Sequence, residues 1–206
     1  MEYLVTMTTH VPDGTSEEAI GDIRAREAAH SGELATQGHL LRLWRPPLQP
    51  GEWRTLGLFA ADDSVGLEEV LASMPLRVWR TDEVAPLSPH PNDPAGQTER
   101  SGTPPPEPEG REFLTTFTVA VPADAAPQNV DATTQCEADR AWELAGQGYL
   151  ERLGSLPGQG RALGLWQAPD SAGMNAILAS LPLSPWMSVQ TTPLTPHPSD
   201  PALTRG

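Results

Sequence analysis

The chain has no lysine and only one cysteine among its 206 residues. Its 13 basic residues are therefore all arginines, which excludes Schiff-base chemistry and the lysine of a phosphate-binding P-loop. The lone Cys136 cannot form an intrachain disulfide, and no set of cysteines and histidines has metal-ligand spacing. We therefore expect no metal site, and we expect arginine, histidine or backbone amides to hold any anionic ligand.

Long apolar runs and net positive charge are absent as well. No apolar stretch approaches the roughly 20 residues that cross a bilayer, and the N-terminal residues lack a basic and apolar leader. The formal net charge of -14 opposes binding to a nucleic-acid backbone. We therefore expect a cytoplasmic protein with a small-molecule ligand and with no membrane or nucleic-acid partner.

What the chain does have is an internal repeat that covers most of its length. The first part of the repeat returns at an offset of 110 residues and, after a three-residue deletion, the rest returns at an offset of 107. The matched segments include 2–8 with 112–118, 37–40 with 147–150, 71–76 with 178–183, and 87–94 with 194–201. We predict a first domain over 1–95, a proline-rich linker over 96–111 and a second domain over 112–206.

Each copy shows the pattern of a small α+β domain. Alternating and β-branched residues predict strands, whereas polar caps, first-turn acids and a later glycine or proline delimit helices. In the first copy the predicted elements are strand 2–10, helix 15–36, strands 39–46 and 52–61, helix 63–74 and strand 77–85. This β-α-β-β-α-β order is the ferredoxin-like fold, and its bare sheet face predicts that the two copies pair as a dimeric α+β barrel.

One glutamate of each copy lies on the apolar stripe of a predicted helix. On a helical wheel Glu27 falls in the same narrow sector as Ile23 and Leu34. Glu137 takes the same place in the second copy. Partial burial raises the pKa of a carboxyl toward the range that is useful for proton transfer. The alternative is a structural ion pair between Glu27 and a strand arginine such as Arg42.

An ordered set of motifs gives both copies a resemblance to muconolactone Δ-isomerase. The motifs are Glu27, Glu33-Leu34, Gly38, Leu43-Trp44-Arg45, Met74-Pro75-Leu76, Trp79 and Pro89-His90-Pro91 in the first copy, and Leu181-Pro182-Leu183-Ser184-Pro185-Trp186-Met187 and Pro196-His197-Pro198-Ser199 in the second. The resemblance implies a ferredoxin-like fold that forms homo-oligomers through its sheets. It also implies a cofactor-free shift of a carbon–carbon double bond in an unsaturated lactone that carries a carboxylate.

The resemblance also implies roles for charged residues. Glu27 fits the base or proton shuttle, Arg45 fits an anion holder, and Glu137 is the counterpart of Glu27. The further candidates for binding an anionic substrate are His30, Arg42, Trp44, Arg54, Arg152 and Arg161. The second copy has Gly154-Ser155 where the first has Trp44-Arg45, so we expect one active site per chain, in the first copy.

Several alternatives remain open at this point. His90 and His197 are interpreted first as solvated or capping residues of the proline-rich tails, and Trp53 and Trp166 either line a pocket or fill an interface. A cofactor-free cyclase or oxygenase acting on an aromatic or polyketide substrate predicts a wide, tryptophan-lined cavity. A binding module without chemistry predicts that a salt bridge neutralises Glu27 and that no cavity lies beside it.

Overall fold

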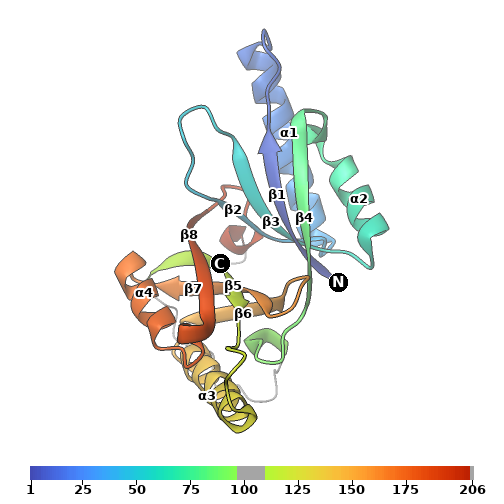
Figure 1. The fold of residues 1–206 in the computed structure, drawn as a ribbon. Helices are drawn as coiled ribbons and strands as arrows, with labels where there is room; N and C mark the ends of the chain where they lie inside the picture. The colour runs from blue at the N-terminus through green and yellow to red at the C-terminus, as the bar shows by residue number, and fades with distance from the viewer. Residues whose placement is uncertain (97–109, 205–206) are drawn as a thin grey trace. The chain divides into compact units, whose positions relative to one another are not determined.

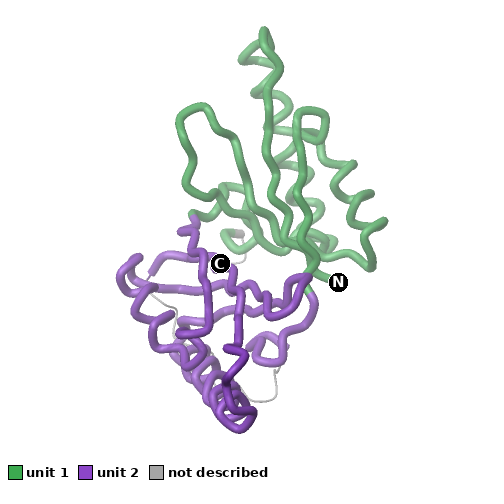
Figure 2. The backbone as a smooth tube through the Cα atoms, in the orientation of Figure 1, with its two compact units in different colours: residues 1–87, 195–206 green, residues 88–194 purple. Residues whose placement is uncertain are grey.

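The computed structural model describes residues 1–96 and 110–204, which form two compact units (Figure 2). Unit 1 consists of residues 1–87 and 195–206, and unit 2 consists of residues 88–194. Apart from its ends, the predicted linker 96–111 lies outside the described residues. In the described part of the chain, no helix is both long enough and apolar enough to cross a membrane.

Unit 1 has the predicted β-α-β-β-α-β order. Its elements are β1 (Glu2–Thr9), α1 (Glu17–Thr36), β2 (Leu40–Arg45), β3 (Arg54–Ala60), α2 (Ser64–Ser73) and β4 (Arg80–Pro89). The strands pair antiparallel in the order β2-β3-β1-β4, with Val5 opposite both Gly57 and Val84. Figure 1 shows α1 and α2 on one face of this sheet, and their Leu34 and Leu71 side chains belong to the same buried core as the strand residues.

Unit 2 repeats this architecture. Its elements are β5 (Arg111–Val119), α3 (Pro127–Gly146), β6 (Leu150–Ser155), β7 (Arg161–Ala168), α4 (Ser171–Ala179) and β8 (Met187–Pro196). The strands pair antiparallel in the order β6-β7-β5-β8, and a separate core gathers Phe113, Leu144, Trp166 and Met174. The predicted fold class is therefore confirmed, because the chain is an α+β protein with two ferredoxin-like domains.

Local capping explains where the helices begin and end. The Ser16 side chain accepts a hydrogen bond from the Ala19 backbone N–H at 3.2 Å, which satisfies one free donor in the first turn of α1. Asp63 does the same for α2, since its carboxylate accepts from the two backbone N–H groups that follow Ser64, at 3.0 and 2.9 Å. Gly38, with φ at +80°, lies just beyond the end of α1, in a backbone conformation that glycine adopts without strain.

The last strand of the first copy differs from the prediction over 77–85. Residues Pro75–Trp79 form a 3-10 helix, and β4 runs from Arg80 to Pro89. Pro75 has no N–H to donate and occupies the first turn of the 3-10 helix, where a helix leaves its N–H groups unpaired in any case. The strand therefore starts three residues later than predicted and extends into the proline-rich tail.

The tails of the two sequence copies belong to the opposite compact units. Residues 195–204 follow the second copy in sequence but belong to unit 1, where Thr195 pairs with Arg45 at the edge of β2. Likewise residues 88–96 belong to unit 2, where Pro89 pairs with Gly154 of β6. Each tail thus covers an otherwise open strand edge, and the compact units differ from the repeats of the sequence at both tails.

Candidate active site

A cavity of about 500 Å³ opens beside α1 in unit 1. Its wall comes from α1, β1, β2, β3, the 3-10 helix, the start of β4 and the tail that follows β8. The lining residues are Met7, Thr9, Arg24, Glu27, Ala28, Ser31, Leu43, Arg45, Trp53, Thr55, Met74, Leu76, Arg80, His197, Pro198 and Ser199. The cavity therefore combines one carboxylate, three guanidinium groups and one imidazole within a partly apolar wall.

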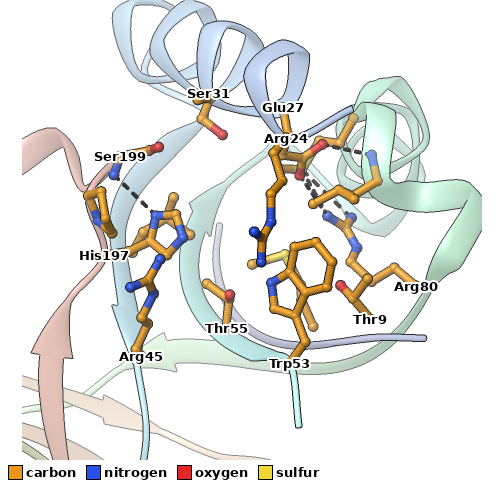
Figure 3. Close-up of a pocket in the computed structure, with 16 residues that line it drawn as sticks. Thr9, Arg24, Glu27, Ser31, Arg45, Trp53, Thr55, Arg80, His197 and Ser199 are labelled. Atoms are coloured by element: carbon orange, nitrogen blue, oxygen red, sulfur yellow. Dashed lines mark hydrogen bonds and ion pairs between the residues drawn. The ribbon is translucent and has the colours of Figure 1, made fainter. Parts of the chain in front are cut away.

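Glu27 lies at one side of this cavity, where two donors fix its carboxylate (Figure 3). Its Oε2 accepts a hydrogen bond from the Leu76 backbone N–H at 2.8 Å, and its Oε1 accepts one from Arg80 Nη1 at 3.3 Å. Burial raises the pKa of the Glu27 carboxyl above its ordinary value, although the Leu76 N–H and the Arg80 charge oppose this shift. The carboxylate is thus oriented and partly desolvated, which suits a group that exchanges a proton.

Arg80 also pairs with a second acid behind Glu27. Its Nε lies 2.7 Å from Asp82 Oδ1, and its Nη2 donates to Asp82 Oδ2 at 3.1 Å. Because Asp82 takes the more direct ion pair, the guanidinium charge is shared and Glu27 is not fully neutralised. Neither residue was predicted from the sequence, although their positions two apart on one strand, which place both side chains on the same face, were a signal for this pair.

Arg45 and His197 lie at the other side of the cavity (Figure 3). His197 Nδ1 accepts a hydrogen bond from the Ser199 backbone N–H at 3.1 Å, so the neutral imidazole carries its proton on Nε2. Burial, helped by the Arg45 charge, lowers the pKa of His197 to about 4. His197 is therefore neutral at physiological pH and lines the cavity rather than being solvated.

Two of the guanidinium groups in the cavity are available to an anionic ligand. Arg24 lies over the ring of Trp53, with its Cζ 4.2 Å from the ring centroid, and this contact helps to fix its guanidinium in the cavity wall. Among the residues that the structure describes, neither Arg24 nor Arg45 has a carboxylate at ion-pair distance. Trp53 thus lines a pocket, one of the two alternatives left open by the sequence.

Asp200 anchors the tail that brings His197 into the cavity. Its side chain is fully buried and accepts a hydrogen bond from the Leu43 backbone N–H at 3.1 Å. Arg42 donates to the same carboxylate from Nε and Nη2, at 3.2 Å each. The alternative ion pair of Glu27 with a strand arginine is therefore formed by Arg80 of β4 and not by Arg42, whose guanidinium is engaged by Asp200.

Unit 2 has a smaller cavity of about 180 Å³ at the matching place. Its lining residues are His90, Pro91, Asn92, Phe117, Val119, Thr134, Glu137, Ala141, Leu153, Ala162, Trp166, Leu181, Leu183 and Met187. Glu137 accepts a hydrogen bond from the Leu183 backbone N–H at 2.9 Å, and burial raises the pKa of its carboxyl. The carboxylate is held as in unit 1, but the described lining of this cavity includes no arginine.

Comparison with known proteins identifies the family. The family model described as muconolactone Δ-isomerase matches the chain twice, over residues 1–93 and 111–200. The chain belongs to the muconolactone Δ-isomerase family. Muconolactone Δ-isomerase 1 of Acinetobacter lwoffii is 32% identical over 92 residues, which are 45% of this chain and 93% of that protein. Muconolactone Δ-isomerase of Rhodococcus opacus is 31% identical over 88 residues, which are 43% of this chain and 95% of that protein.

A solved structure matches nearly the whole chain. Chlorite dismutase from Candidatus Nitrospira defluvii, in complex with imidazole, covers 95% of this chain and 91% of its own, with a TM-score of 0.58 and 11% sequence identity. At that identity the likeness describes the fold alone. The family assignment therefore rests on the two sequence matches, each of which spans one copy.

The structure brings some of the predicted site residues together and separates others. Glu27 and Arg45 line the first cavity, and Glu137 lines the second. The other predicted residues lie outside the cavity linings, and their side chains have other contacts. His30 bonds to Glu33 and Ser73, Arg42 and Arg152 contact Asp200 and Asp93, Trp44 is buried, Arg54 pairs with Glu52, and Arg161 bonds to the Pro157 carbonyl.

Proposed function

We propose that the cavity of unit 1 catalyses a cofactor-independent double-bond shift in an unsaturated lactone that carries a carboxylate, with muconolactone as the first substrate to test. The observation that supports this most directly is the placement of Glu27. A desolvated carboxylate with fixed orientation shares one cavity with two guanidinium groups, those of Arg24 and Arg45, that have no acidic partner among the described residues. The family membership of the chain points to the same class of reaction.

Glu27 acts as the base and then as the acid in this proposal. Its carboxylate takes the proton from the carbon γ to the lactone carbonyl, and the electrons of that C–H bond form a dienolate. The Glu27 carboxylic acid then returns a proton to the α carbon, so the double bond moves from the α,β to the β,γ position. No atom is gained or lost, and the raised pKa of Glu27 brings the carboxyl closer to the carbon acid in proton affinity.

The opposite side of the cavity would hold the negative charges of the substrate. Arg45 can engage the substrate carboxylate with two parallel hydrogen bonds, and Arg24 adds a second positive charge. The neutral His197 has its Nε2–H available, so it can donate to the lactone oxygen on which charge develops. Arg45 and His197 lie across the cavity from the base, whereas Arg24 belongs to the same helix as Glu27.

The alternatives make different demands on the same cavity. A binding module requires Glu27 to be neutralised with no cavity beside it, but the cavity is present and Asp82 competes for Arg80. A cyclase or oxygenase for bulky aromatic substrates requires several tryptophans in the wall, whereas Trp53 is the tryptophan among the described lining residues. The geometry therefore favours a small anionic substrate. The homo-oligomer implied by the resemblance stays a prediction.

The test is to incubate the purified chain with muconolactone and follow the ultraviolet absorbance as the double bond moves. We expect turnover without added metal or cofactor, together with exchange of the transferred hydrogen with deuterium when the reaction runs in D₂O. An absence of turnover by the wild-type chain would refute muconolactone as the substrate. Turnover that survives Glu27→Gln would refute the assignment of the base.

A further inference from the structure

The cavity of unit 2 has kept the carboxylate of unit 1 but has lost its positive charge. The three arginines of the first cavity, Arg24, Arg45 and Arg80, correspond in the repeat to Thr134, Ser155 and Met187. Three hydroxyl-bearing residues, Thr9, Ser31 and Thr55, correspond to Val119, Ala141 and Ala162. The replacements all lower polarity, so the second cavity presents a different ligand environment rather than a collapsed version of the first.

An anion would be held poorly in this cavity. The Glu137 carboxylate accepts a hydrogen bond from the Leu183 N–H and, among the described lining residues, there is no guanidinium to offset a second negative charge. Bringing a carboxylate ligand beside Glu137 would add like-charge repulsion to the cost of desolvation. The cavity therefore selects against the charged substrate class proposed for unit 1.

Four lining residues have polar side chains, His90, Asn92, Thr134 and Glu137, and two of them, the carboxylate and the imidazole, can orient an uncharged ligand. Glu137 has a carboxylate that accepts hydrogen bonds, and His90 supplies an imidazole from the tail that belongs to unit 2. His90 Nδ1 accepts from the Asn92 backbone N–H at 3.2 Å, so the neutral ring has its proton on Nε2 and can donate. A hydroxyl group, which both donates and accepts, complements this pair.

The rest of the wall suits a flat apolar group of limited size. Phe117 and Trp166 lie edge to face, with ring centroids 6.2 Å apart, and the remaining lining is mostly apolar, from leucine, alanine, valine, methionine and proline side chains. A volume of about 180 Å³ is below the range of roughly 300–1,000 Å³ that is typical for drug-sized ligands. It is close to that of apolar cavities of roughly 150 Å³ that take up a single benzene ring.

From this composition we infer that unit 2 contains a second binding site, specific for uncharged, single-ring aromatic compounds that carry a hydroxyl group. The ring packs against Phe117 and Trp166, and the hydroxyl group bonds to Glu137 and His90. This site does not depend on the reaction proposed for unit 1, and its ligand differs from that substrate in charge.

The test uses the wild-type chain and reads both cavities at once. Trp166 lines the second cavity and Trp53 lines the first, so their indole N–H signals in a ¹⁵N-labelled sample report on each site separately. Trp166→Phe and Trp53→Phe assign the two signals. Phenol is expected to shift the Trp166 signal saturably and to leave Trp53 unchanged, whereas benzoate, which has a similar ring and a negative charge, leaves Trp166 unchanged.

A matched pair of variants then locates phenol. Ala162 and Thr55 are equivalent in the repeat, and each lines its own cavity. Ala162→Leu fills the second cavity and should weaken phenol binding at least about tenfold, because the ring and the added carbons compete for one space. Thr55→Leu fills the first cavity instead and should leave the phenol titration unchanged.

Three results would overturn the inference. The first is no saturable Trp166 shift up to the solubility limit of phenol. The second is a Trp166 shift with benzoate as large as that with phenol. The third is undiminished phenol binding by folded Ala162→Leu. If Ala162→Leu does not fold, the titrations of the wild-type chain with phenol and benzoate still test the proposed site through the first two results.

Discussion

The two cavities hold the same carboxylate in the same way but surround it differently. Glu27 and Glu137 each accept a backbone N–H, at 2.8 and 2.9 Å, and burial raises the pKa of both. Only the first cavity adds Arg24, Arg45 and Arg80 among the described residues. A glutamate on the apolar stripe of a helix is therefore a feature of the fold, whereas the ability to hold an anionic substrate depends on residues elsewhere.

The largest expected effect comes from removing one carboxylate at a time. Glu27→Gln should lower kcat for lactone isomerisation by about 10³-fold, since general-base catalysis contributes roughly 10²–10⁴-fold. Glu137→Gln should leave kcat within about twofold of wild type, because the second cavity lacks the anion-binding arginines. Steady-state kinetics on both variants measures the difference. Equal losses would show that the two cavities work together.

Asp200 and Asp93 are the buried acids of the two tails, and replacing each of them should lower the free energy of unfolding by a different amount. Asp200→Ala should lower the free energy of unfolding by about 3 kcal/mol, because it leaves the Arg42 charge and the Leu43 N–H without their buried acceptor. Asp93→Ala should cost less, about 1–2 kcal/mol, since its contact with Arg152 is longer, at 3.5 Å. Urea denaturation monitored by circular dichroism measures both values, and a larger loss for Asp93→Ala would contradict this ranking.

A smaller effect, on KM, is expected when Arg45 of the first copy is replaced by the residue that the second copy has at the equivalent position. Arg45→Ser, which introduces the residue found at the equivalent position 155, should raise KM about 10- to 100-fold, as expected for a lost charged hydrogen bond worth about 1.5–3 kcal/mol. kcat should change less, because Arg45 lies across the cavity from Glu27. Arg161→Ser, at an exposed arginine outside the linings, is the control. An unchanged KM for Arg45→Ser would exclude Arg45 as the carboxylate holder.

A further expected effect is a change in the acid sensitivity of stability. The pKa of His197 is lowered from 6.5 to about 4, so between these pH values the unfolded chain binds a proton that the folded chain does not. This contribution to stability is full above pH 6.5 and is lost as the pH falls toward 4. His197→Gln should therefore lose less stability than wild type between pH 7 and pH 4.5, measured as urea midpoints. An identical loss would contradict the neutral state of His197.

The sequence predicted the fold well because the relevant signals are local or repeated. Ser16, Asp63 and Gly38 mark helix ends through their own capping geometry, and the repeat offset transfers each assignment to the second copy. Glu27 was found for the same reason, since helical spacing places it on the apolar stripe. The start of the last strand was missed because Pro75–Trp79 has strand-like residues but forms a 3-10 helix.

Contacts between distant segments could not be read from the repeat. Arg80 is 53 positions from Glu27, and helix geometry does not specify which strand arginine reaches the carboxylate. The tails posed a harder problem, because both copies carry a Pro-His-Pro segment followed by an Asp. Either tail is compatible with either unit in sequence, and only the pairing of Thr195 with Arg45 and the burial of Asp200 beside Arg42 decide between them.

The C-terminal tail follows the second copy in sequence but is part of the candidate active-site cavity of the first copy. His197 and Asp200 are encoded with the second copy but complete the cavity around Glu27. The described lining of the second copy's own cavity has no arginine, while the tail of that copy supplies residues to the first cavity. A chain cut after the first copy would therefore have a cavity without this imidazole and a β2 edge without the buried Asp200 carboxylate.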